Sequence, residues 1–179
     1  GAAATLEPLS QHLAEYDAHL ANLFGAGVQA CYRGWRLYDT DATKAVVKKW
    51  VDFYKAHRAI LESDLIHVRR ADGRDLDALL HANPRLKTKG LAVVYNPLAR
   101  PVKKTLTLPL YYTGLTDTAA VRREDGPPVS YKLDREFRIE LPVEVGGRID
   151  LMVEVPHLAA SLPAGAIIAP TDLEMKRVP

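Results

Sequence analysis

Residues 33–39 bring together side chains of the kinds that bind sugars. They include an indole at Trp35, guanidinium groups at Arg33 and Arg36, and a carboxylate at Asp39. A flat aromatic face can stack on a sugar ring, while guanidinium and carboxylate groups form directed hydrogen bonds with polar ligands. These four residues are therefore the candidate substrate-binding site. The alternative is a structural clamp, in which the arginines pair with nearby aspartates and Trp35 fills a domain interface.

Asp39, the last residue of this loop, and Asp41 just after it could be considered as a catalytic pair. Glycoside hydrolysis needs two carboxyl groups about 5 to 9 Å apart, on opposite sides of the scissile bond. Residues this close in sequence could span the shorter distance. Aspartates at the start of a helix also cap its free amide groups, which explains both residues more simply. We therefore assign no catalytic residue.

The other reactive side chains favour no metal site and no cofactor. His67 and His81 fall in neighbouring predicted strands, but a two-residue turn at Asp72-Gly73 would not place them opposite one another. Cys31 is the only cysteine, which excludes an intrachain disulfide and a cysteine-built zinc site. No phosphate-binding loop and no serine nucleophile elbow is present.

Tyr111 and Tyr112 form an aromatic pair that could serve as a binding platform. Neighbouring residues of a strand face opposite sides of the sheet. If the pair lies on a strand, one ring therefore enters the core and the other lies on the surface. We expect this packing role rather than a platform.

Charge and composition exclude two classes of partner. The chain has 179 residues, with 24 basic and 22 acidic side chains and a net charge of +2. The basic residues are dispersed along the sequence, so we expect no nucleic-acid partner. No apolar run approaches the roughly 20 residues that span a bilayer, so we expect no membrane partner. Hydrophobic residues make up 47% of the chain, which predicts a folded core.

The elements that must position these residues change in type near Asp64. Residues 1–63 predict a helix, a short strand and a second helix. An apolar stripe from Leu6 to Leu23 steps by three and four residues, which is typical of a helix. Residues 28–32 are largely uncharged and bounded by glycine, and they predict a strand buried on both faces.

The second helix begins at Thr40 or Asp41, either of which can cap it. It carries one broad apolar face, formed by Val46, Val47, Trp50, Val51, Phe53, Tyr54, Ile60 and Leu61. The order helix, strand, helix is typical of the closing unit of a (β/α) barrel. One such unit cannot fold alone, so we expect this face to pack against a barrel domain or a second copy of the chain.

Residues 64–156 predict an antiparallel β-sandwich. Short candidate strands alternate with Gly, Pro, Asn and Asp turn signals, and they cover residues 65–70, 76–82, 91–96, 102–108, 118–122, 130–133, 138–141 and 149–155. Asp72-Gly73 is the strongest hairpin signal, and its register predicts a salt bridge between Arg70 and Asp75. Residues 157–179 predict an irregular tail. The fold class is thus α+β, with an N-terminal helix–strand–helix followed by the sandwich.

Three stretches resemble a known family. They are GVQACYRGWRLYD at residues 27–39, DLIHVRRADGRD at residues 64–75 and YYTGLTD at residues 111–117. They look like the C-terminal region of bacterial glycoside hydrolase-like proteins of the α-galactosidase-like kind. In that family a catalytic (β/α) barrel runs into an antiparallel β-sandwich. The catalytic aspartates of the family lie on earlier barrel strands that this sequence does not contain, so none can be carried over.

The resemblance implies a non-catalytic C-terminal part of a carbohydrate-active protein, bracing its catalytic barrel. It also favours a secreted or periplasmic location. Two other hypotheses stay open. A separate carbohydrate-binding module would show exposed aromatic side chains on the sandwich. A protein-interaction or oligomerisation domain would instead use the apolar face of the second helix.

Overall fold

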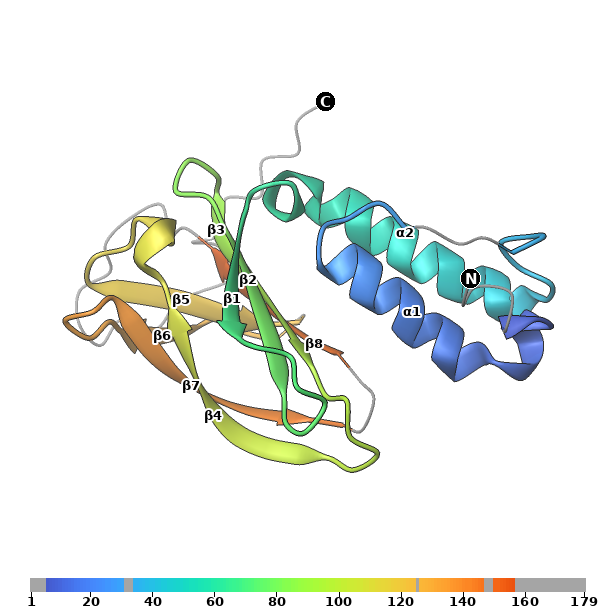
Figure 1. Cartoon of the computed structure of the whole chain (residues 1–179). Coiled ribbons are helices and arrows are strands. Elements are labelled where there is room, and N and C mark those ends of the chain that lie inside the picture. The colour runs from blue at the N-terminus through green and yellow to red at the C-terminus, as the bar shows by residue number, and fades with distance from the viewer. Residues whose placement is uncertain (1–5, 31–33, 125, 147–149, 157–179) are drawn as a thin grey trace.

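The computed structural model describes residues 6–30, 34–124, 126–146 and 150–156, the last range by its backbone alone. Two helices lie beside a body of β-strands (Figure 1). The predicted α+β class, with N-terminal helices followed by antiparallel strands, is confirmed. The predicted irregular tail over residues 157–179 lies outside the described residues.

The helices α1 (Leu13–Gly25) and α2 (Asp41–Leu61) form a helical pair, preceded by the short 3-10 helix η2 (Leu9–Gln11). The helices lie side by side and run in the same direction, each ending toward the sandwich (Figure 1). As predicted, Thr40 caps α2, because its hydroxyl accepts the Thr43 N–H at 3.3 Å. The residues buried between the helices are Leu9, Tyr16, Leu20, Ala21 and Trp50.

The short buried strand predicted over residues 28–32 is wrong for the part of it that the structure describes, which has no regular structure. Gly27 adopts a positive φ of 70°, and its N–H donates to the Phe24 carbonyl at 3.0 Å. The Val28 N–H donates to the Leu23 carbonyl at 3.1 Å. These bonds end α1 in a Schellman motif and leave Val28 exposed, so this segment is used for helix termination instead.

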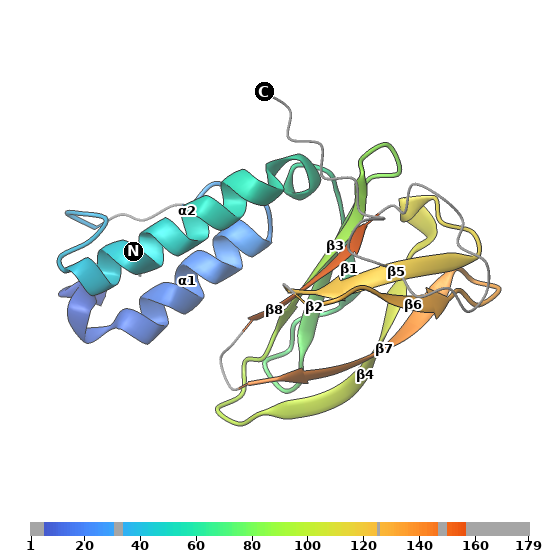
Figure 2. The same cartoon turned by 180° about the vertical axis from the view of Figure 1, so that it is seen from behind.

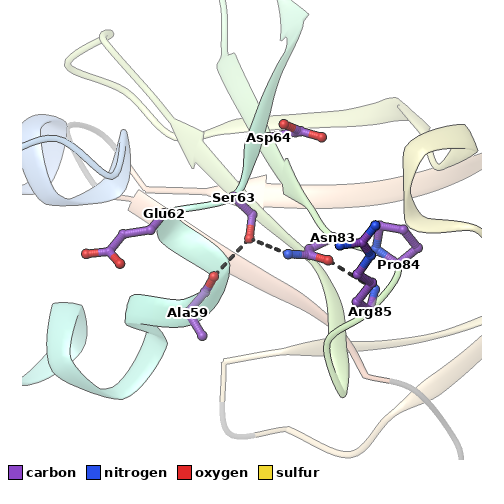
Figure 3. Close-up of a pocket in the computed structure, with 7 residues that line it drawn as sticks. All are labelled: Ala59, Glu62, Ser63, Asp64, Asn83, Pro84 and Arg85. Carbon is purple, nitrogen blue, oxygen red and sulfur yellow. Dashed lines mark hydrogen bonds between the residues drawn. The ribbon is translucent and has the colours of Figure 1, made fainter.

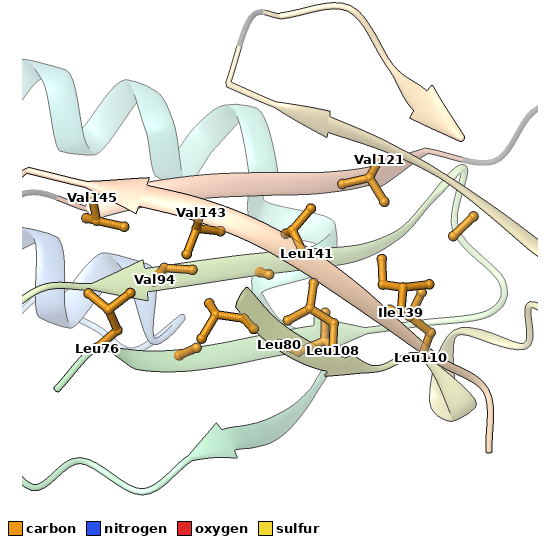
Figure 4. Close-up of a cluster of buried hydrophobic side chains, with 14 of the residues drawn as sticks. Leu76, Leu80, Val94, Leu108, Leu110, Val121, Ile139, Leu141, Val143 and Val145 are labelled. Carbon is orange, nitrogen blue, oxygen red and sulfur yellow. The ribbon is translucent and has the colours of Figure 1, made fainter. Parts of the chain in front are cut away.

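Eight strands follow the helical pair within the described part of the chain. They are β1 (Asp64–Arg69), β2 (Asp77–Ala82), β3 (Thr88–Tyr95), β4 (Val102–Pro109), β5 (Thr118–Arg123), β6 (Val129–Lys132), β7 (Arg138–Val145) and β8 (Asp150–Pro156). One sheet has the order β1-β2-β3-β8-β5-β6, and the other consists of β4 and β7. The two sheets enclose the main apolar core (Figure 4).

Strand β3 is covered on both faces. Ala92 and Val94 belong to the core between the sheets, whereas Leu91 and Val93 pack with Ile60 and its neighbours at the end of α2. Successive side chains of a strand face opposite ways, so this run of buried apolar residues serves two layers. The helical pair therefore rests on the outer face of the large sheet through its C-terminal ends.

The connection between β1 and β2 is longer than the predicted two-residue turn. Asp72 accepts hydrogen bonds from Arg69 Nη2 at 2.6 Å and from the Arg74 N–H at 2.9 Å. These contacts hold a wider loop, in which Gly73 has a φ of 68°. A bulge in β1 shifts the register further, so that His81 lies opposite Leu65.

The predicted salt bridge between Arg70 and Asp75 is wrong for the same reason. In the wider loop Asp75 forms an ion pair with Lys104 of β4 instead. The neighbouring residue Arg69 forms two further ion pairs, to Asp72 at 2.6 Å and to Asp77 at 3.5 Å. Lys104 thus links the small sheet to the β1–β2 connection.

Candidate functional site

The loop predicted to bind sugars lies at the end of the helical pair farthest from the sandwich (Figure 2). Of its four candidate residues, Arg33 lies outside the described residues. The Trp35 side chain is 97% exposed, and Leu37 and Tyr38 beside it are also exposed. This exposed segment, residues 35–38, is called the distal segment below.

Asp39 is held by its own chain. Its Oδ2 accepts hydrogen bonds from the Ser10 N–H and the Ser10 hydroxyl, both at 3.0 Å, and its Oδ1 accepts the Thr43 hydroxyl at 3.0 Å. The bond from the Ser10 N–H is the main cause that lowers the pKa of Asp39 below its ordinary value. Asp39 therefore ties the segment before α1 to the first turn of α2.

Arg36 also contacts the chain itself. Its Nη2 lies 3.3 Å from Glu7 Oε2, and the neighbouring Leu37 carbonyl accepts the Tyr16 hydroxyl at 2.8 Å. Both contacts fix the loop against the start of α1. In the described part of the loop, no hydrogen bond or ion pair joins Trp35, Arg36 and Asp39 to one another. Sugar binding by these residues stays a prediction.

A polar depression of about 680 Å³ lies where α2 meets the β2–β3 turn. Its lining consists of Ala59, Glu62, Ser63, Asp64, Asn83, Pro84 and Arg85 (Figure 3). Asn83 Nδ2 donates to the Ser63 hydroxyl at 3.0 Å, which in turn donates to the Ala59 carbonyl at 2.8 Å. These bonds fasten the helix end to the turn. A turn signal at Asn83-Pro84 was the one feature of the sequence that pointed to this region, and no sequence pattern predicted the depression.

Glu62 at the rim of the depression is also engaged. Its carboxylate accepts Arg58 Nε at 2.7 Å and the Tyr54 hydroxyl at 3.1 Å. The bond from Arg58 is the main cause that lowers the pKa of Glu62. An ionised, hydrogen-bonded carboxylate of this kind is a poor proton donor near neutral pH, so the depression offers no general acid at this position.

Tyr111 and Tyr112 do not follow the predicted packing. They lie on a 3-10 helix, η3 (Tyr111–Thr113), rather than on a strand, and both side chains are more than half exposed. The buried residues of this turn are its flanking ones, Leu110 and Thr113. The prediction that one of the two tyrosine rings lies in the core was therefore wrong. It assumed the alternating side-chain directions of a strand, which a turn does not have.

His81 joins the helical pair to the sandwich. Its side chain is fully buried, and its Nε2 lies 2.8 Å from the Gly25 carbonyl oxygen. A carbonyl only accepts, so Nε2 carries the proton and Nδ1 is left as an acceptor, which has no partner among the described residues. Burial lowers the pKa of His81. No group of metal-ligating side chains occurs in the described ranges.

No helix in the described ranges is long and apolar enough to cross a membrane. No protein-family model matches this chain. No curated protein matches it either.

The fold does resemble solved structures of glycoside hydrolases. The α-amylase from Geobacillus thermoleovorans matches with a TM-score of 0.52 at 12% identity, over 80% of this chain and 34% of that one. The α-galactosidase I from Mortierella vinacea matches with a TM-score of 0.51 at 10% identity, over 83% of this chain and 37% of that one.

A putative α-N-acetylgalactosaminidase from Bacillus halodurans matches with a TM-score of 0.50 at 15% identity, over 79% of this chain and 32% of that one. At these identities the likeness concerns the fold alone. This chain spans about a third of the length of these three proteins. The likeness to glycoside hydrolases predicted from the sequence is thus confirmed for the fold of a part of such proteins.

Proposed function

We propose that this chain is the non-catalytic C-terminal part of a glycoside hydrolase-like protein. In this proposal the helical pair closes a catalytic (β/α) barrel, and the sandwich braces that barrel from outside. The observation that carries the proposal is the parallel course of α1 and α2, which requires the chain to run back along the pair between them.

The parallel course follows from contacts along the whole length of the helices. Near their starts, Ser10 binds Asp39, and near their ends the rings of Phe24 and Tyr54 lie 5.5 Å apart. In a (β/α) barrel each pair of neighbouring helices is parallel, because a strand runs back between them. Here too the chain must return from the end of α1 to the start of α2 between the two helices.

The exposed apolar surface of the helical pair supports the same proposal. Two helices form only one layer, and an apolar helix face needs a second layer to cover it. The sandwich covers only the C-terminal ends of the pair, while Val46, Val47 and Val51 of α2 stay half-buried and Trp35 is exposed. A barrel would supply the missing layer over the rest.

The position of the distal segment also agrees with the proposed barrel-closing role. In a (β/α) barrel, the loops between a strand and the following helix form the active-site face. Residues 34–40 connect the returning segment to the start of α2 and would lie on that face. Trp35, with Arg33 and Arg36, could then form one wall of a sugar cleft, while the catalytic carboxylates would come from the barrel.

The test is hydrogen exchange of the helical pair in two contexts. We would compare the isolated 179-residue chain with the complete natural polypeptide that contains it. The proposal expects backbone amides of α1 and α2 to exchange at least about tenfold more slowly in the complete polypeptide, because the barrel covers them. Equal exchange in both contexts would contradict it, as would a natural polypeptide without a barrel sequence.

Sedimentation of the isolated chain separates this role from oligomerisation. A concentration-dependent dimer that protects the same helix faces would favour the oligomerisation hypothesis instead. A glycan array with Trp35→Ala as the paired variant tests the sugar-binding loop. Sugar binding that is lost in this variant would place the distal segment in a binding site even without the barrel.

A further inference from the structure

The aromatic turn η3 lies on the part of the sandwich that faces away from the helical pair, as both cartoon views show (Figures 1 and 2). It follows β4 and carries Tyr111 and Tyr112, which are 63% and 57% exposed. Large aromatic side chains that a domain leaves on its surface next to each other are a common mark of a binding site. The proposed barrel contact involves the helical pair and leaves this turn unused.

Hydrogen bonds to buried groups fix the backbone of the turn η3. The fully buried Thr113 donates its hydroxyl hydrogen bond to the Leu110 carbonyl at 2.6 Å, and Gly114 ends the turn with a φ of 73°. The Leu110 N–H in turn donates to the Phe137 carbonyl at 2.8 Å. The backbone beneath the two tyrosines is therefore fixed before any ligand arrives, which reduces the entropy lost on binding.

Phe137 supports the tyrosines from the neighbouring loop. Its ring centroid lies 5.7 Å from that of Tyr111, and its backbone has a φ of 58°, which is unusual for a residue with a bulky side chain. Asp134 holds this loop, because its Oδ1 accepts the N–H groups of Glu136 and Arg138, both at 2.8 Å. Strained backbone that is held in this way often occurs at binding sites.

We propose that Tyr111 and Tyr112, supported by Phe137, form a saccharide-binding platform on the sandwich. The two tyrosine rings lie 5.3 Å apart at an interplanar angle of 88°, so they form a corner rather than a flat wall. The C–H groups of a pyranose ring carry partial positive charge and pack against the negative face of one aromatic ring. The second ring then borders the sugar at its edge.

Polar groups for the sugar hydroxyls are available at the same place. Within the described residues, the hydroxyls of Tyr111 and Tyr112 make no hydrogen bond to the chain, so both remain available to a ligand. Both phenolic hydroxyls can donate or accept a hydrogen bond. Together they match the mixed donors and acceptors of a sugar ring.

The size and charge of the platform favour a saccharide over a protein partner. Protein interfaces bury about 800 Å² on each partner and contain few charged residues at their centre. Here the exposed aromatic area consists of two tyrosines with charged neighbours on the adjacent loop, where Arg138 pairs with Glu136 at 2.6 Å. A ligand the size of one or two sugar rings fits this area.

The experiment is a glycan array with the 179-residue chain, followed by titration of the best array ligand. The variants are Tyr111→Ala, Tyr112→Ala and Tyr112→Phe, and the control is Leu65→Ala, which changes an exposed apolar side chain of β1. Trp35→Ala is added to test the distal segment separately. We expect each alanine variant to weaken binding at least about tenfold, and Tyr112→Phe to keep most of the affinity because it retains the ring face. Leu65→Ala should bind as the unchanged chain does.

Several outcomes would overturn the platform. They are the absence of any array ligand that binds at about 10 mM, and binding that both alanine variants retain. Binding that only Trp35→Ala abolishes would also overturn it, because the distal segment would then hold the sugar. Circular dichroism of each variant confirms that the sandwich is folded. A platform variant that lost binding together with its β-sheet signal would be replaced by its leucine counterpart, which removes the aromatic face with a smaller loss of volume and should also weaken binding at least about tenfold.

Discussion

The imidazole of His81 on β2 lies 2.8 Å from the carbonyl oxygen of Gly25, the last residue of α1. This hydrogen bond joins the sandwich to the helical pair in a fully buried position. The last carbonyl groups of a helix have no hydrogen-bond partner within the helix. The N–H of His81 supplies this missing partner to the Gly25 carbonyl. His81 thus acts as a structural link, and its environment favours the neutral ring.

We expect His81 to make the stability of the chain depend on pH. Burial lowers its pKa in the folded chain below the ordinary value of 6.5. At a pH between the folded-state pKa of His81 and 6.5, the unfolded chain binds a proton at His81 that the folded chain does not bind. The free energy of unfolding should therefore be greatest above pH 6.5 and fall as the pH decreases below it, by at most about 1.4 kcal/mol per pH unit. Urea unfolding between pH 5.5 and 8 measures this slope.

The matched variants are His81→Gln and His67→Gln. Glutamine at position 81 can still donate a hydrogen bond but does not titrate, so the slope between pH 5.5 and 6.5 should become shallower. His67 lies on the adjacent strand with an exposed side chain, and its replacement tests whether any strand histidine has the same effect. An unchanged slope in His81→Gln would contradict the assignment.

Gly27 and Gly73 form a second matched pair. Both have a positive φ, at 70° and 68°, but a Cβ at Gly27 would lie 2.2 Å from the Leu61 carbonyl oxygen, whereas nothing lies within 4 Å of one at Gly73. Gly73→Ala should cost about 1 kcal/mol in unfolding free energy, the conformational penalty alone. Gly27→Ala should cost about 2 kcal/mol more, because a backbone atom must move.

Urea unfolding of both glycine variants provides the measurement. Equal losses would show that the end of α1 does not lie against the end of α2 as described. A larger loss at Gly27 would support close contact at this junction. Gly73 is a suitable control because its loop lies beside the sheet and away from the helical pair.

Periodicity predicted most of the fold. The step of three and four residues along α1 and α2, and the turn signals between strands, are local properties of the sequence, so the elements lie close to their predicted ranges. The predicted strand over residues 28–32 failed because a short uncharged run flanked by glycine is also compatible with a helix end. Gly27 completes the Schellman motif, and the sequence alone could not distinguish these two uses.

The candidate site was less predictable, because its contacts join distant residues. Asp39 accepts from Ser10, which lies 29 positions away, and no sequence pattern indicates such a pair. The exposure of Tyr111 and Tyr112 depends on whether their segment is a strand or a turn. Proline at 109 and glycine at 114 are the residues of the sequence that favour a turn over a strand in this segment.

Asp39 should stabilise the chain through its charged form. Its pKa in the folded chain lies below the ordinary value of 3.8, so its contribution is present above that pH and is lost as the pH falls through the folded value. Asp39→Asn should lower the melting temperature at pH 6. The melting temperature of this variant should also fall less between pH 6 and pH 3 than that of the unchanged chain. Asp41→Asn, at the first residue of α2, is the control. Its melting temperature should fall between pH 6 and pH 3 by nearly as much as that of the unchanged chain. Thermal melts by circular dichroism measure both. An Asp39→Asn chain with the same acid profile as the unchanged chain would contradict the role of the carboxylate.

The contact between Gly25 and Tyr95 allows a double-mutant cycle across the same junction. A Cβ at Gly25 would lie 2.2 Å from the Tyr95 hydroxyl oxygen, which donates to the Ala21 carbonyl at 3.4 Å. Gly25→Ala should destabilise the chain despite the helix preference of alanine, and Tyr95→Phe should cost about 1 kcal/mol at most. The double variant lacks the Tyr95 hydroxyl oxygen with which the new methyl group would collide. Its loss of unfolding free energy should therefore be smaller, by about 1 kcal/mol or more, than the sum of the losses of the two single variants. Urea unfolding of the four proteins measures the coupling. If the two changes are simply additive, the end of α1 does not pack on β3 at this position.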